Sequence, residues 1–191
     1  MISLVLHGKG SSPNKVTWLS DPLKEFGQVL VPPFDYEVGE GVERASSLSF
    51  DLIAGHSRGG TIALVVGALK GKPVIAVSAP TDRVKQLEYL STFPEGTLQH
   101  RTYLDLSKVP REELVKYSPI NYADKLKKVL LIHGKNDEVV LPSHSVELCE
   151  RVKENGGDCE LHLLEMRHSP PAHAFKEIKE IIVKWVRIQF Y

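Results

Sequence analysis

A serine between two glycines is the first residue in this sequence whose setting predicts chemistry. The segment FDLIAGHSRGGTIAL, residues 50–64, places Ser57 two positions after Gly55 and two positions before Gly59. Strand-forming residues precede this G-x-S-x-G pattern and small, apolar residues follow it, which is typical of a sharp strand-to-helix turn called the nucleophile elbow. Glycines beside the serine let the two backbones approach closely. We therefore predict that the Ser57 hydroxyl projects from the end of a strand as a nucleophile.

A serine hydroxyl needs a base, and eight histidines are available. His168 and His173 follow the last predicted strand, where the base is expected when a triad runs in the order Ser, acid, His. With Ser169 as N-cap and Pro170 as the first helical residue, His168 lies in the loop above the sheet and His173 in the first helical turn. Positive charge is unfavourable at a helix N-terminus, so His168 is the preferred base. His173 stays open as the alternative, because Pro170 and Pro171 can instead run extended and delay the helix.

Asp137 is the predicted orienting acid, because it follows a strand-forming run in LLIHGKND, residues 130–137. Its carboxylate would accept the Nδ1 proton of His168 and hold the tautomer. An Asx turn that closes an exposed loop is the competing interpretation of this aspartate. Glu138 and Asp82 are weaker candidates for the acid.

A tetrahedral oxyanion also needs donors, and two backbone N–H groups are predicted to supply them. Arg58 follows the nucleophile and begins the helix, and Lys9 lies in the glycine turn HGKG, residues 7–10. Both donors are main-chain groups, so we expect the Lys9 and Arg58 side chains to be solvated rather than catalytic.

The elements that must position these residues alternate between strand and helix. Strands are predicted at 2–6, 28–31, 50–54, 73–78, 128–133 and 159–165, and helices at 13–26, 61–69, 143–155 and the C-terminus, with room for one short helix in 35–49. Short apolar runs rich in Val and Ile are typical of strands buried on both faces of a parallel sheet. This pattern predicts helices on both faces and a ligand crevice at the carboxyl ends of the strands.

The segment from 79 to 119 interrupts the alternation. We expect residues 1–191 to form one domain with a short, lid-like insertion around 80–119. Tyr89, Phe93 and Tyr103 are candidate linings of a substrate pocket in this insertion, and plain core packing is the competing interpretation of the three aromatics.

Composition excludes several classes of function. Residues of hydrophobic type make up 42% of the 191 residues and the formal net charge is +0, so neither nucleic acid nor a membrane surface is an expected partner. No leader or spanning segment is recognisable, and we expect a cytoplasmic protein, as a monomer or homodimer. Cys149 and Cys159 are not spaced as a C-x-x-C pair, and we expect two free thiols rather than a disulfide.

At these residues the sequence resembles the α/β-hydrolase superfamily, through LHGKGSS at the glycine turn, GHSRGG at the elbow, SPINYADKLKKVLLIHGKNDEVVLP around the acid and MRHSPPAHAF at the base. Residues 118–142 are most similar to the hydrolase domains of prolyl-oligopeptidase-type and dienelactone-hydrolase-like proteins. The resemblance implies a three-layer fold with a mostly parallel sheet of about six strands, in a minimal version without the leading hairpin. It also implies acylation of Ser57 by a small carboxylic ester and hydrolysis through His168, with no metal or organic cofactor.

Three functions remain open from the sequence. The preferred one is a carboxylesterase-like serine hydrolase that acts on a small-molecule ester. An aminoacyl peptidase or thioesterase of the same fold is the first alternative. A ligand-binding protein that keeps the elbow without turnover is the second, although the intact set of Ser57, Asp137 and His168 argues against it.

Overall fold

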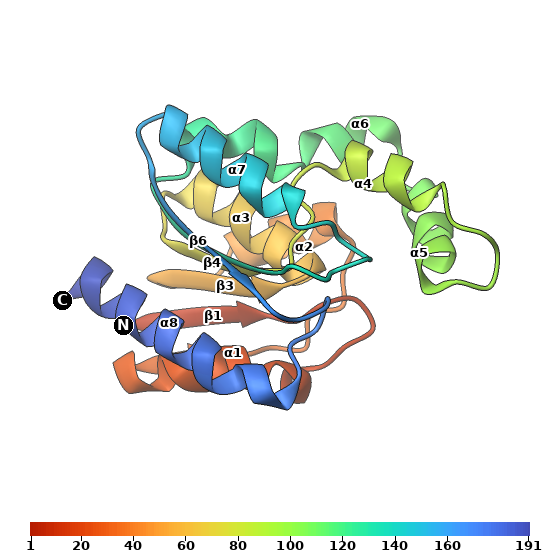
Figure 1. Cartoon of the computed structure of the whole chain (residues 1–191). Helices are drawn as coiled ribbons and strands as arrows, with labels where there is room; N and C mark the ends of the chain where they lie inside the picture. The colour runs from red at the N-terminus through yellow and green to blue at the C-terminus, as the bar shows by residue number, and fades with distance from the viewer.

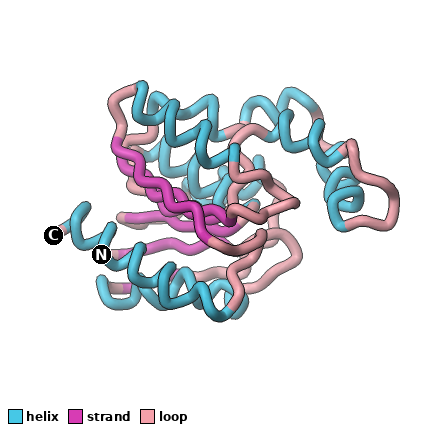
Figure 2. The backbone as a smooth tube through the Cα atoms, in the orientation of Figure 1, coloured by secondary structure: helices cyan, strands magenta, loops and turns pink.

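A six-stranded parallel sheet forms the centre of the computed structural model, which describes residues 1–191 (Figure 2). Its strands are β1 (Ile2–Leu6), β2 (Gln28–Leu30), β3 (Leu52–His56), β4 (Val74–Val77), β5 (Lys128–Gly134) and β6 (Asp158–Leu164). They follow the order β2-β1-β3-β4-β5-β6, and every neighbouring pair is parallel. Loops that leave the carboxyl ends of the strands therefore gather at one edge of the sheet, opposite the two chain termini (Figure 1).

Helices cover both faces of the sheet (Figure 1). One face carries α1 (Thr17–Ser20) and α8 (Phe175–Phe190), and the other carries α2 (Val38–Ser46), α3 (Arg58–Lys70) and α7 (Ser143–Glu154). The elbow helix α3 lies between the sheet and its neighbours, which is why it is apolar on nearly all sides, with buried residues from Gly59 to Ala68. This arrangement confirms the predicted three-layer α/β architecture.

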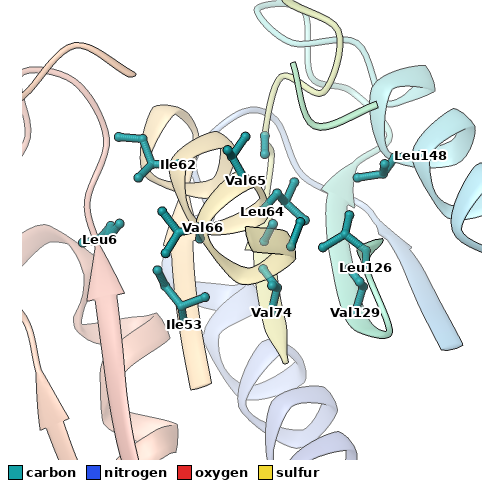
Figure 3. Close-up of a cluster of buried hydrophobic side chains, with 14 of the residues drawn as sticks. Leu6, Ile53, Ile62, Leu64, Val65, Val66, Val74, Leu126, Val129 and Leu148 are labelled. Carbon is teal, nitrogen blue, oxygen red and sulfur yellow. The ribbon is translucent and has the colours of Figure 1, made fainter. Parts of the chain in front are cut away.

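Two hydrophobic clusters, one on each face, hold the layers together. Side chains alternate between the faces along each strand. On one face Leu6, Ile53 and Val74 pack against Ile62 and other residues of α3 (Figure 3). On the opposite face, Val5, Ile75 and Ile132 of the strands pack with α1 and with Ile178 and Trp185 of α8.

Three helices after β4 form a cap, which we define as residues 83–116. The cap consists of α4 (Arg83–Leu90), α5 (Leu98–Ser107) and α6 (Arg111–Lys116), and it is followed by the 3₁₀ helix η3 (Pro119–Lys125). Helix α5 packs on α4, contributes no buried residue and stands away from the body of the molecule (Figure 1). The cap therefore shares little of the core.

Two predicted helices differ from those in the structure. Residues 13–26 form the 3₁₀ helix η1 (Pro13–Val16), the single turn α1 and the 3₁₀ helix η2 (Asp21–Phe26) rather than one α-helix. Pro22 lies within this segment, and a proline cannot donate the backbone hydrogen bond that a continuous helix needs. The prediction of Ser169 as the N-cap is also wrong, because Pro171 is extended, with φ −76° and ψ 162°, and α8 begins at Phe175 after the 3₁₀ turn η4 (Ala172–Ala174).

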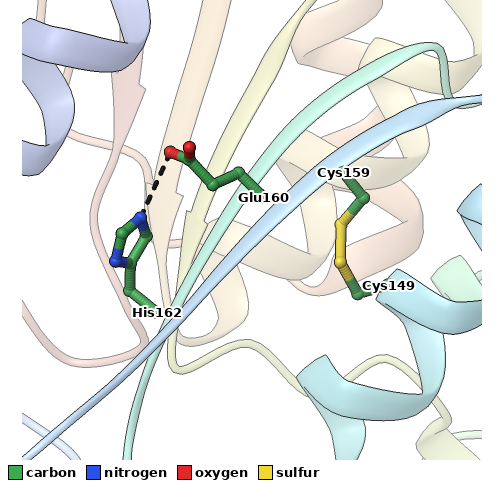
Figure 4. The surroundings of a disulfide bond; sticks show 4 residues. All are labelled: Cys149, Cys159, Glu160 and His162. Carbon is green, nitrogen blue, oxygen red and sulfur yellow. Dashed lines mark ion pairs between the residues drawn. A yellow bond between two sulfur atoms is a disulfide. The ribbon is translucent and has the colours of Figure 1, made fainter.

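Cys149 and Cys159 form a disulfide, so the expectation of two free thiols is wrong (Figure 4). Cys149 lies in α7 and Cys159 in β6, and the chain reverses between these two elements so that the Cα atoms lie 5.5 Å apart. Both side chains are buried in the cluster beneath α7. The spacing in the sequence does not reveal this contact, because it depends on how α7 packs against the sheet.

No helix combines the length and the apolar character that crossing a bilayer requires.

Candidate active site

Ser57 stands at the junction of β3 and α3 in a conformation that L-residues rarely adopt. Its backbone has φ 56° and ψ −122°, and α3 begins at the next residue. A Cβ atom on Gly55 would lie 2.1 Å from the Gly59 carbonyl oxygen, and one on Gly59 would lie 2.3 Å from the Leu6 carbonyl oxygen. Glycine is required at both positions, as the motif predicts, and the tight packing holds the strained serine in place.

The structure brings the three predicted residues Ser57, His168 and Asp137 into one hydrogen-bonded chain. His168 lies in the loop after β6, with Nε2 at 2.9 Å from Ser57 Oγ. Its Nδ1 lies 2.8 Å from Asp137 Oδ2. His173, the alternative base, lies in the exposed turn η4 and makes no hydrogen bond or ion pair. The geometry therefore pairs His168, not His173, with the serine.

The Asp137 carboxylate is completely buried and has several donors. Its Oδ1 accepts hydrogen bonds from the backbone N–H groups of Val139 at 3.0 Å and Val140 at 2.9 Å. Its Oδ2 also lies 3.3 Å from Nε2 of the buried His133. Burial alone would raise the pKa of Asp137, but the hydrogen bonds from His133 and His168 outweigh it and hold the pKa well below its ordinary value. Both interpretations of Asp137 fit this geometry, because Oδ1 closes the turn and Oδ2 faces His168.

Lys9 and Arg58, whose backbone N–H groups are the predicted oxyanion donors, line the same cavity as Ser57. Arg58 is the first residue of α3, so its N–H has no acceptor within the helix. The turn after β1 approaches the elbow so closely that a Cβ on Gly8 would lie 3.4 Å from Ser57 Cβ. The N–H of Lys9, the next residue, donates to no group of the protein. Both N–H groups are therefore free of an acceptor in turns that lie close together, and their role as oxyanion donors stays a prediction.

Buried histidines that the sequence did not single out fix the loops around these residues. His56 Nε2 lies 3.0 Å from the His168 carbonyl oxygen, and its ring packs edge-on against Trp18. His7 Nε2 accepts the Phe34 N–H at 2.8 Å beneath the glycine turn. Burial, and next the charge of His168, lower the pKa of His56 to about 4, so His56 is neutral at pH 7 and donates Nε2–H to the His168 carbonyl. In the sequence, each of these histidines stands beside a glycine at the end of a strand. This pattern predicts where the histidine lies in the fold, but it does not predict which group the histidine contacts.

A cavity of about 120 Å³ opens beside Ser57. The strand-end loops contribute Ser57 and Val140 to its wall, and the cap contributes Arg83, Thr102 and Leu106. The cap therefore reaches the reacting group although most of it lies outside the core.

The three aromatics that were candidates for lining the pocket, Tyr89, Phe93 and Tyr103, do not line it. Tyr89 packs edge-on against Phe93, with ring centroids 5.1 Å apart, and its hydroxyl donates to the Glu138 carbonyl oxygen at 2.7 Å. Tyr103 packs against the His100 ring. None of the three borders the cavity, and the cap side of its wall consists of Arg83, Gln86, Thr102, Asp105 and Leu106.

No group of three or more His, Cys, Asp or Glu side chains is arranged to hold a metal ion.

Comparisons with known proteins give one family and one fold. A profile described as the prolyl oligopeptidase family matches residues 51–187. Curated protein sequences give no match. Among solved structures, the chain is similar to the Pyrococcus furiosus esterase Pf2001 with 21% identity and a TM-score of 0.70, over 98% of this chain and 82% of that one. It is also similar to the Paleococcus ferrophilus monoacylglycerol lipase, with 17% identity and a TM-score of 0.71 over 97% and 93% of the two chains. Est1E from Butyrivibrio proteoclasticus gives 20% identity and a TM-score of 0.67 over 97% and 88%.

Proposed function

The chain belongs to the prolyl oligopeptidase family and has the α/β-hydrolase fold, and from this premise we propose that it is a serine hydrolase that cleaves small carboxylic esters. The observation that carries the proposal is the unbroken contact from Ser57 Oγ through the His168 ring to Asp137, at 2.9 Å and 2.8 Å. Both distances lie within the range for proton transfer between a nucleophile, its base and an orienting group.

In the acylation step, Ser57 Oγ attacks the ester carbonyl carbon while His168 Nε2 takes the hydroxyl proton. Asp137 accepts a hydrogen bond from His168 Nδ1–H, which leaves Nε2 free to act as the base. The tetrahedral intermediate then collapses, and His168 returns the proton to the departing alcohol oxygen. The product of this step is an acyl group on Ser57.

In the deacylation step, a water molecule replaces the alcohol and the same proton transfers occur in the same order. The negative charge on the carbonyl oxygen develops next to the backbone N–H groups of Lys9 and Arg58. Loss of one such donor costs about 3 to 4 kcal/mol of transition-state stabilisation in serine hydrolases. Since the donors are main-chain groups in packed turns, their positions are fixed before the substrate arrives.

An aminoacyl peptidase is the second candidate, and the matched family favours it, because its description names an oligopeptidase. The same three residues would attack an amide carbonyl, with His168 protonating the departing amine. Comparable turnover of aminoacyl amides and matched esters would support this candidate, and turnover of esters alone would exclude it.

The test compares wild type with Ser57→Ala, with 4-nitrophenyl acetate as substrate. We expect a burst of one nitrophenolate per active site followed by steady turnover in wild type, and neither in Ser57→Ala. Ser107→Ala is the matched control, because Ser107 is an exposed serine on α5, and it should keep the wild-type rate. Equal product release by wild type and Ser57→Ala would refute the proposal and leave the ligand-binding alternative.

A further inference from the structure

Two arginines with little-exposed side chains line the cavity beside Ser57. The Arg58 side chain is 14% exposed and the Arg83 side chain is 4% exposed. Arg58 is the first residue of α3 and Arg83 the first residue of the cap helix α4. The cavity therefore has one arginine from the body of the molecule and one from the cap. The expectation that the Arg58 side chain is solvated is wrong, because only 14% of it is exposed.

Each arginine has an acidic partner that is more exposed than the arginine itself. Arg58 contacts Asp35, and Arg83 Nη2 donates to Glu37 Oε1 at 2.7 Å. The side chains of Asp35 and Glu37 are 55% and 47% exposed, so water solvates them more than it solvates the two guanidinium groups. Each carboxylate contacts only Nη2 of its arginine, so other N–H donors of the same guanidinium group stay without it.

One further donor of each guanidinium group has no acceptor. Arg58 Nε and Arg83 Nη1 are buried and make no hydrogen bond. Gln86 Oε1, in the same wall, is a buried acceptor without a partner. Burial lowers the pKa of Arg83 even though Glu37 opposes this effect, so its partner does not fully replace the lost hydration. Native proteins rarely leave buried polar groups unpaired. The two arginine donors point to a ligand that supplies an acceptor, whereas Gln86 Oε1 would need a donor.

The charges of the wall limit what that ligand can be. Lys9, Arg58 and Arg83 are positive and Glu37 and Asp105 are negative, which leaves an excess of one positive charge among the lining side chains. Asp35, outside the lining, pairs with Arg58 and balances this excess. A ligand with one negative charge is therefore favoured over a doubly charged phosphate, which the carboxylates of Glu37 and Asp105 would repel. A carboxylate also matches the planar fork of a guanidinium group.

We propose that Arg58 and Arg83 bind a carboxylate of the substrate, so that the enzyme prefers esters that carry one free carboxylate close to the scissile bond. This inference rests on the proposed function, because Ser57 must be the nucleophile for the cavity to hold part of the substrate. Arg83 and the Arg58 side chain then determine specificity, while the Arg58 N–H serves the oxyanion.

The first experiment measures kcat/KM for two acid-bearing esters and a neutral one by pH-stat titration. Monomethyl glutarate carries the carboxylate on the acyl side, carboxymethyl butanoate carries it on the alcohol side, and methyl butanoate has none. We expect at least one acid-bearing ester to exceed the neutral ester by about tenfold or more, as expected for a charge-assisted hydrogen bond. In Arg83→Gln that ratio should fall to within about threefold of unity.

Arg44→Gln is the matched control. Arg44 is an exposed arginine of α2 that pairs with Glu40 within its own helix, and its replacement should leave the ratio unchanged. No preference in wild type, or a preference that survives in Arg83→Gln, would overturn the proposal. Arg58→Gln alters the same wall from another element, and it provides the same test if Arg83→Gln does not fold.

A binding measurement separates this inference from the proposed function. We expect butanoate to bind wild type at least about tenfold more tightly than butanamide, its uncharged analogue, by calorimetry. If no ester is hydrolysed but butanoate is preferred, the proposed function fails and the carboxylate site stands. If esters are hydrolysed but butanamide binds as well as butanoate, the function stands and the carboxylate site is refuted.

Discussion

The two regions that border the cavity, the strand-end loops and the cap, differ in how many buried contacts fix them. The strand-end loops, which follow β1, β3, β4, β5 and β6, are fixed by four buried histidines: His7, His56, His133 and His144. His133 illustrates the pattern, because its Nδ1 lies 2.7 Å from Ser145 Oγ and its Nε2 lies 2.8 Å from the Val140 carbonyl oxygen. In the cap, by contrast, α5 buries no side chain, and Leu98 and Leu104 are about half exposed.

This difference suits the two regions to different tasks, proton transfer and substrate entry. Proton transfer needs groups held within a fraction of an ångström, and packed loops with satisfied hydrogen bonds provide this. Substrate entry needs an element that can move at low cost, and a helix with few buried contacts provides that. We therefore expect the residues of the chemistry to come from the strand-end loops and the cap to affect mainly binding. Four predictions test this division, from the largest effect to the smallest.

Replacement of His168 by alanine should lower kcat by about 10⁴-fold to 10⁶-fold, because Ser57 then has no base. His173→Ala is the matched control, since His173 lies five residues away in an exposed turn without polar contacts, and it should keep the wild-type rate. Single-turnover hydrolysis of 4-nitrophenyl acetate measures both variants. The opposite result, with His173→Ala inactive and His168→Ala active, would mean that His173 is the base and that the assignment to His168 is wrong.

Gly59→Ala should destabilise the protein by more than about 3 kcal/mol or prevent folding, because its Cβ would lie 2.3 Å from the Leu6 carbonyl oxygen. Leu104→Ala in the cap removes a larger side chain, but one that is 47% exposed, and it should change stability by no more than about 0.5 kcal/mol. Urea unfolding at pH 7 gives both free energies. A cap substitution as costly as the elbow substitution would mean that the cap belongs to the core.

The same division explains which parts of the site could be predicted from sequence. Ser57, Asp137 and His168 follow strands directly, so the order of strands and the rule that parallel strands end at one edge place them together. The glycines of the elbow carry the same kind of local information, because steric conflict at a tight turn depends on immediate neighbours. Neither the clustering of the three residues nor the need for glycine at the elbow depends on many long-range contacts.

The remaining features depend on long-range packing. Whether Tyr89 or Arg83 faces the cavity depends on the orientation of α4 about its axis where it packs on the rest of the protein. No local sequence pattern predicts this orientation. The pairing of Cys149 with Cys159 depends likewise on the contact of α7 with β6. The late start of α8 at Phe175 follows from the extended conformation at Pro171, which the sequence analysis kept as the alternative.

The strand-end loops should weaken in mild acid because a buried histidine there resists protonation. Burial lowers the pKa of His144 to about 4, and its Nδ1 accepts the N–H groups of Thr81 at 3.1 Å and Asp82 at 3.2 Å. The charged and titratable groups around it are His133, Asp82, Lys85 and Glu147. Between pH 6.5 and 4 the unfolded chain binds more protons than the folded one, so stability falls as pH decreases through this range.

His144 should account for a loss of about 2 kcal/mol between pH 7 and pH 5. Urea unfolding of His144→Gln should show a shallower decrease over this interval than wild type, even though the variant is less stable at pH 7. His173→Gln removes an exposed histidine and should keep the wild-type slope. Parallel curves for wild type and His144→Gln would mean that His144 titrates equally in the folded and unfolded chains.

The smallest effect is expected where the two regions meet. Lys9, in the turn after β1, forms an ion pair with Asp105 of α5 beside the cavity, and this contact lowers the pKa of Asp105. Both side chains are about half exposed, and ion pairs of this kind contribute less than about 1 kcal/mol. Asp105→Asn should therefore change KM for 4-nitrophenyl acetate by no more than about fivefold and leave kcat within about twofold, because the Lys9 N–H stays in its packed turn. A large fall in kcat with KM unchanged would instead mean that the cap sets the position of the oxyanion donor, and the two regions would then act as one.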